Sequence, residues 1–77
     1  MSDRITRANV DERCANVNRR MESRGSKIRY RVEGRNGYIG LDRYIGEACQ
    51  STVTVGTKAE LGAFLHAMMV ALDDAKV

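Results

Sequence analysis

The sequence has few of the residues from which metal centres and disulfide-rich folds are built. Its 77 residues include two cysteines, one histidine and no proline. Two cysteines are too few for a disulfide framework, although a single bridge between Cys14 and Cys49 remains possible. One histidine and two scattered cysteines are also too few for a structural zinc site, so we expect no metal and no cofactor.

Long apolar segments are also lacking. No window approaches the ~20 consecutive apolar residues that span a bilayer. The first residues, Met1 to Arg4, are mostly polar and hold no apolar core of a secretory signal. We therefore expect a cytoplasmic protein with reduced thiols and no membrane partner. The length allows one domain, and 43% hydrophobic against 30% charged residues argues against a wholly disordered chain.

The charge is unevenly placed along the chain. The formal net charge is +3. Residues 1–35 hold ten basic and five acidic residues, a net of +5, whereas residues 36–77 hold three and five, a net of −2. Such asymmetry indicates either an anionic partner or a solvated basic surface.

The apolar pattern predicts a first helix over residues 10–23. Asn9 and Glu12 fit a reciprocal N-terminal cap, and Gly25 lies where a left-handed residue would end the helix. Apolar residues at spacings of four, three and four form a core stripe: Val10, Cys14, Val17 and Met21. A row of arginines follows one edge of this stripe: Arg13, Arg20 and Arg24. Residues 1–8 are expected to form a flexible segment, and residues 9–77 a single domain.

Three strands are expected over residues 27–33, 38–45 and 50–55. Alternating apolar and charged residues in the first strand indicate a sheet that is covered on one side only. Asn36-Gly37 predicts a tight hairpin between the first two strands, and residues 46–48 a second turn. The expected inward residues are Ile28, Tyr30, Val32, Ile39 and Leu41, and the second strand shows Tyr38, Asp42 and Tyr44 on the open face. Arg43 would then point inward, so a bulge or an early strand end is expected near it.

A second helix is expected to begin at Lys58, because Thr57 and Glu60 form a capping box before an apolar run. Its core stripe consists of Leu61, Phe64, Leu65, Met68 and Leu72. No charged residue stands between Glu60 and Asp73, so the opposite face is unusually apolar. The expected fold class is α+β in the order α-β-β-β-α, with two helices packed on one face of a three-stranded antiparallel sheet.

Catalysis is not expected. His66 is the single histidine, and no serine, cysteine or carboxylate is spaced to pair with it. Cys14 lies within the core stripe, and Cys49 at a turn has no neighbouring pattern that would lower the pKa of its thiol. Gly34 and Gly37 precede no helix and form no phosphate-binding loop. We therefore predict a protein that is not an enzyme and has no small-molecule substrate.

Nucleic-acid binding is one of two functional hypotheses. Arginines and tyrosines on the open sheet face can contact phosphates and stack on bases. With the arginine row of the first helix, the candidate surface consists of Arg13, Arg20, Arg24, Lys27, Arg29, Arg31, Tyr38 and Tyr44. The element order also resembles the double-stranded-RNA-binding domain, whose second helix begins with a lysine cluster. Here residues 57–62 read Thr-Lys-Ala-Glu-Leu-Gly, with one lysine, so the binding residues of that family are missing.

Protein binding, above all as a homodimer, is the other hypothesis. Small apolar residues allow helices to approach closely, and exposed apolar surface on a small domain indicates an interface. The candidate partner surface consists of Ala63, His66, Ala67 and Val70. The simpler alternative is that these modest side chains are ordinary surface composition.

The chain also resembles small accessory proteins of tailed bacteriophages, especially those that infect actinobacteria. The resemblance covers about residues 15–72 and rests on residues 15–21, 36–44 and 56–60 with the following Phe64-Leu65. It implies a viral origin, a host cytoplasmic location and a host or phage protein as partner, and it implies no catalytic residues. We therefore predict a non-enzymatic interaction module, with a small nucleic-acid-binding protein as the alternative.

Overall fold

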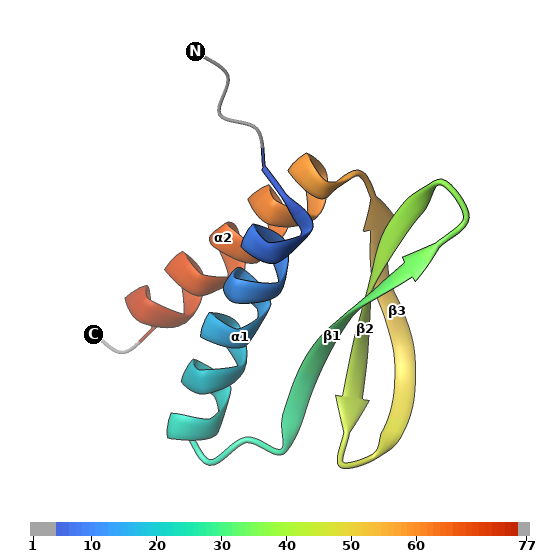
Figure 1. Ribbon diagram of the computed structural model, residues 1–77. Helices are drawn as coiled ribbons and strands as arrows, with labels where there is room; N and C mark the ends of the chain where they lie inside the picture. The colour runs from blue at the N-terminus through green and yellow to red at the C-terminus, as the bar shows by residue number, and fades with distance from the viewer. Residues whose placement is uncertain (1–4, 76–77) are drawn as a thin grey trace.

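The computed structural model describes residues 5–75, which form two helices and one antiparallel sheet (Figure 1). The order is α1 (Arg7–Ser23), β1 (Ile28–Arg35), β2 (Tyr38–Ile45), β3 (Ala48–Gly56) and α2 (Lys58–Asp74). The strands are arranged as β1-β2-β3, and both helices lie on the same face of the sheet. The predicted α-β-β-β-α fold class is confirmed. Neither helix in the described part of the chain is long and apolar enough to cross a membrane.

Helix α1 begins three residues earlier than predicted, and its predicted cap is wrong. Thr6 is the N-cap: its hydroxyl accepts from the Asn9 backbone N–H at 3.2 Å, while Asn9 Oδ1 accepts from the Thr6 N–H at 3.1 Å. The box was missed because asparagine takes the place usually held by Glu or Gln. Residues 7 and 8 of the segment expected to be flexible are therefore helical, and residues 1–4 lie outside the described residues.

The end of α1 follows the prediction. Gly25 has a φ of 76°, in the left-handed region that favours glycine. Its N–H donates to the Glu22 carbonyl at 2.9 Å, and the Ser26 N–H donates to the Met21 carbonyl at 3.0 Å. These two bonds are those of a Schellman motif, which satisfies the last carbonyls of the helix.

The strands match the predicted ones, with β1 and β3 longer than expected. At the first hairpin only Gly37 has positive φ, so the turn is not the type I′ turn that Asn-Gly favours. The predicted irregularity near Arg43 is present on the partner strand. The β2–β3 pairing shifts between Leu41 and Asp42 and again between Arg43 and Tyr44. These shifts leave Gln50 and Val53 as extra residues in β3.

The core lies between the helices and the β1–β2 half of the sheet. Seven apolar residues are buried: Val10, Cys14, Val17, Ile39, Leu41, Leu61 and Leu65. The prediction that Phe64 belongs to the core is wrong, because its side chain is 38% exposed. Helix α2 is rotated so that Gly62 faces Arg13 of α1 and Met69 packs against the core, and this leaves Phe64 outward.

The surroundings of Asp42 differ from those expected on an open sheet face. It points to the open face as predicted, yet it is buried. Arg35 covers it, with Nη2 at 2.9 Å from Oδ1, and the Thr52 hydroxyl donates to the same oxygen at 2.8 Å. Arg35 can lie flat there because Gly40 has no side chain: a Cβ at Gly40 would stand 2.7 Å from Arg35 Cζ.

Candidate functional site

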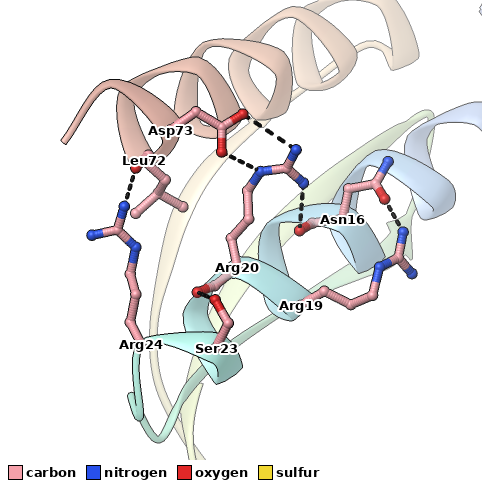
Figure 2. Close-up of polar contacts among 7 residues, drawn as sticks. All are labelled: Asn16, Arg19, Arg20, Ser23, Arg24, Leu72 and Asp73. Carbon is pink, nitrogen blue, oxygen red and sulfur yellow. Dashed lines mark hydrogen bonds and ion pairs between the residues drawn. The ribbon is translucent and has the colours of Figure 1, made fainter. Parts of the chain in front are cut away.

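The three arginines of the predicted row are bonded to α2, and Figure 2 shows the contacts of Arg20 and of Arg24, the C-cap of α1. Arg13 Nη1 donates to the Gly62 carbonyl at 3.0 Å. Arg20 forms a two-pronged pair with Asp73, with distances of 2.8 and 3.2 Å. Arg24 Nη2 donates to the Leu72 carbonyl. These predicted anion-binding residues therefore join the two helices.

The C-terminal end of α2 explains why two of these arginines lie there. The last turn of α2 contains no basic residue and ends in Asp73 and Asp74, although the C-terminus of a helix favours positive charge. Arg20 and Arg24 supply that charge from α1, and the hydrogen bond to Asp73 holds the pKa of Arg20 above its ordinary value. Arg20 also donates to the Asn16 carbonyl at 3.2 Å (Figure 2). This edge of α1 is thus occupied by structural contacts.

Gly62 allows the close contact between the helices. A Cβ at this position would lie 2.7 Å from Ile5 Cδ1 and 3.1 Å from Arg13 Nη1. A glycine inside a helix costs about 1 kcal/mol relative to alanine, so this one has a packing reason. The interruption of the helical pattern at residue 62 is the sequence signal that could have identified it.

The cations of the open sheet face are mostly engaged by neighbouring groups. Arg29 Nη1 donates to the carbonyls of residues 26 and 28, at 2.7 Å each, and its Nη2 lies 3.7 Å from a Glu22 carboxylate oxygen. The Arg31 guanidinium stands 4.7 Å from the centre of the Tyr44 ring. Partial burial is the main cause that raises the pKa of Tyr44. Arg31 and Tyr44 therefore form one cation–π pair on this face.

The other predicted residues of this surface lie at its ends. Lys27 is exposed just before β1, and Tyr38 is 45% exposed at the first hairpin. Tyr38 also lines an open pocket of about 330 Å³ with Arg35, Gly37, Ile39, Gly56, Thr57 and Lys58. One of the two cations in this pocket, Arg35, is already paired with Asp42. The pocket holds no nucleophile next to a general base, which acyl-transfer chemistry would need.

The cysteines and the histidine are separate from one another. Cys14 donates to the Tyr30 carbonyl at 3.1 Å, and burial raises the pKa of its thiol to about 11. Cys49 is exposed, and both cysteines are free. Within residues 5–75 no three His, Cys, Asp or Glu side chains come together in a way that could hold a metal ion.

Helix α2 presents an exposed apolar surface on the side away from α1. We call it the α2 outer face: it consists of Ala63, Phe64, Ala67, Val70 and Ala71, all exposed. Ala67 lies at its centre, since the other four are three or four residues away along the helix. His66, also exposed, borders it. Three predicted partner residues are thus brought together, and Phe64 enlarges the surface that sequence reasoning described.

The two edges of the sheet differ in how they are covered. Asn18 seals the edge of β1: its Nδ2 donates to the Tyr30 carbonyl at 2.9 Å, and its Oδ1 accepts from the Tyr30 N–H at 2.8 Å. Arg7 Nη2 donates to the Val32 carbonyl at 3.0 Å on the same edge. The outer edge of β3 receives no such bond from any residue in the range 5–75. Seven of the nine β3 residues are exposed, and none is charged.

Comparisons of the chain with protein-family models, curated proteins and solved structures find no match. The argument for function therefore rests on the surfaces. The predicted basic surface is divided: three arginines are bonded to α2, Arg29 is bonded to nearby carbonyls, Arg31 pairs with Tyr44, and Lys27 and Tyr38 are exposed at its ends. The predicted partner residues are all exposed on α2.

Proposed function

We propose that this protein is a non-enzymatic interaction module that forms a homodimer through the α2 outer face. The observation that carries the proposal is the exposure of this face, with Phe64 38% and Val70 42% exposed on a helix that has no charge between Glu60 and Asp73. Exposed apolar patches on small domains mark interaction sites. The alanines between these two side chains allow a partner to approach closely.

The distribution of charge supports a second copy as the partner. Each copy carries a net charge of +3, and the resulting repulsion at long range is weak enough for an apolar contact to outweigh it. The arginines among residues 5–75 lie on α1, at its C-cap or on the sheet, whereas the α2 outer face carries none. Two copies that meet through this face bury no charged side chain, which avoids the cost of removing a charge from water.

The setting we propose is that of a small bacteriophage accessory protein. The support for it is the resemblance of residues 15–72 to such proteins, as described above. The dimer would then bind a host or phage protein. A 77-residue domain is marginally stable, and dimerisation stabilises the folded chain by mass action.

The test is the mass of the protein in solution, measured by sedimentation equilibrium from about 0.5 to 500 µM, a range that begins below a micromolar dissociation constant and ends far above it. We expect the wild type to dimerise, and Ala67→Glu and Val70→Glu to shift it to the monomer because each places a charge in the apolar contact. Ala15→Glu is the matched control: it adds the same charge to an exposed position of α1 and should leave the dimer intact. A wild type that stays monomeric up to the highest concentration contradicts the proposal.

Nucleic-acid binding is the second candidate, and the pair of exposed Arg31 and half-buried Tyr44 is the observation that favours it. Binding to duplex or single-stranded DNA should then be measurable at ~50 mM salt and should weaken as salt is raised. If Arg29→Glu with Arg31→Glu abolishes such binding, the order of the two candidates is reversed. Undetectable binding at low salt removes the second candidate.

A further inference from the structure

The unprotected edge of β3 lies on the same side of the molecule as the α2 outer face. Helix α1 packs on β1, whereas α2 packs on β2 and β3. Within α2, Gly62 faces α1, and Phe64 stands two residues further along, about 200° round the helix. Phe64 therefore points away from α1, toward the β3 side. The N-terminal part of the α2 outer face and the free strand edge therefore lie on the same side of the molecule.

The free edge has few of the features that prevent strand pairing. Edge strands are usually protected by charged residues, by proline or by a covering segment. Strand β3 contains no charged residue and no proline, and its centre is the β-branched run Thr52, Val53, Thr54 and Val55. The two extra residues, Gln50 and Val53, are its only irregularities. They interrupt the ladder and increase the twist, so they favour one short pairing rather than open-ended stacking.

We infer that two copies of this chain pair antiparallel along β3 and form one six-stranded sheet, with their α2 helices side by side over the joint. The inference rests on the proposed function and names the strand that completes the same dimer. A two-fold axis perpendicular to the sheet keeps the helices of both copies on one face. It also brings Phe64 and Ala67 of each copy toward the joint. Because Asn18 and Arg7 close the β1 edge, each copy has one edge to offer, and the assembly closes at two.

The size of the surface indicates that β3 and α2 act together. A standard interface uses about 20–30 residues on each side. The α2 outer face supplies five side chains, three of them alanine, which is a small part of an interface of that size. Adding the nine residues of β3 gives fourteen per copy, which is below the standard size and in the range of weak or transient contacts.

Charges at the two ends of β3 fit a second copy in antiparallel orientation. Glu47 stands immediately before the strand, and Lys58 stands two residues after its end. Antiparallel pairing places the start of one β3 beside the end of the other, so Glu47 of each copy approaches Lys58 of its mate. Opposite charges therefore meet at both ends of the joint, while the strand between them is neutral.

A charge-swap series tests this arrangement on the full chain. Glu47→Lys and Lys58→Glu should each raise the dissociation constant by roughly 3- to 10-fold, because each change creates two like-charge contacts per dimer. The double variant with both changes should return the constant to near its wild-type value. Both positions are exposed, so the fold should be kept, and circular dichroism checks this.

Hydrogen exchange provides the second measurement. Amides of β3 that point to the free edge should become protected as the concentration is raised through the dissociation constant. A dimer with unprotected β3 amides and no response to the charge swap overturns this inference and leaves the α2 interface standing. A wild type that is monomeric at ~500 µM, far above a micromolar dissociation constant, overturns both.

Discussion

Gly62 shows how a missing side chain sets the contact between the helices. The space that a Cβ would need is filled by Ile5 Cδ1 at 2.7 Å, and Arg13 donates to the carbonyl of the same residue. Helix propensity alone favours alanine here by about 1 kcal/mol. Packing and propensity therefore oppose each other at this position, and the balance can be measured.

We expect Gly62→Ala to destabilise the protein by about 1 kcal/mol, because displacing Ile5 and Arg13 outweighs the gain in helix propensity. Urea denaturation checks this. The matched control is Ala15→Gly at an exposed position inside α1 and outside the proposed interface, where the propensity loss of about 1 kcal/mol should appear by itself. A Gly62→Ala variant that is more stable than wild type would contradict the packing argument.

Because the Cys14 thiol is buried, we expect the protein to lose stability at alkaline pH. Burial raises the pKa of its thiol from 9.0 to about 11, so the unfolded chain ionises first as the pH rises. The stabilisation is complete below about pH 9 and is lost as the pH rises through 11, by roughly 2–3 kcal/mol in total. Urea denaturation at pH 7.5 and 10.5 measures it.

Cys14→Ala is the control for that experiment. The Tyr30 carbonyl keeps its bond from Asn18 in this variant, so no buried acceptor loses its partner. The variant should show a smaller fall in stability between the two pH values than the wild type. Equal falls would assign the pH dependence to other groups.

At the scale of the elements, the sequence predicted correctly those helix and strand ends that depend on residues close together in the chain. The Thr57 and Glu60 box, the Gly25 end of α1 and the bounds of β2 depend on residues close in sequence. Contacts between distant residues were not predictable in this way. The rotation of α2 that exposes Phe64 follows from its packing against α1, and the arginine row is occupied by groups about 50 residues away.

Two substitutions distinguish the observed cap of α1, formed by Thr6 and Asn9, from the cap of Asn9 and Glu12 that the sequence predicted. We expect Thr6→Ala to cost about 1 kcal/mol, since the hydroxyl that accepts from the Asn9 N–H is lost. Glu12→Ala should change the stability by less than about 0.5 kcal/mol, because this exposed side chain caps nothing. Thermal unfolding of both variants is sufficient. The opposite order of effects would restore the Asn9 and Glu12 cap that the sequence predicted.

At the scale of the whole molecule, the charge asymmetry has acquired a structural meaning. Part of the net charge of +5 in residues 1–35 belongs to arginines that join elements of the fold. Arg7 bonds to β1, and Arg13, Arg20 and Arg24 bond to α2. The side formed by β3 and the α2 outer face received none of these residues. The α2 outer face and β3 contain no charged residue. In the sequence, this side was indicated by the uncharged stretch between Glu60 and Asp73.

A dimer formed through the open side makes stability depend on protein concentration. A folded dimer in equilibrium with unfolded monomers gains about 0.7 kcal/mol per protomer for each tenfold rise in concentration above the dissociation constant, half of the 1.4 kcal/mol per decade of the dimer. The thermal midpoint of the wild type should therefore rise steadily between about 20 and 500 µM, where a micromolar dimer is well populated. Ala67→Glu should have a midpoint that does not change over this range, because its monomer has no partner to gain. Ala15→Glu should keep the wild-type slope, which separates the loss of the interface from the effect of an added charge. A wild-type midpoint that is independent of concentration would leave α2 and β3 as ordinary surface, and the stability of the fold would have to come from the core alone.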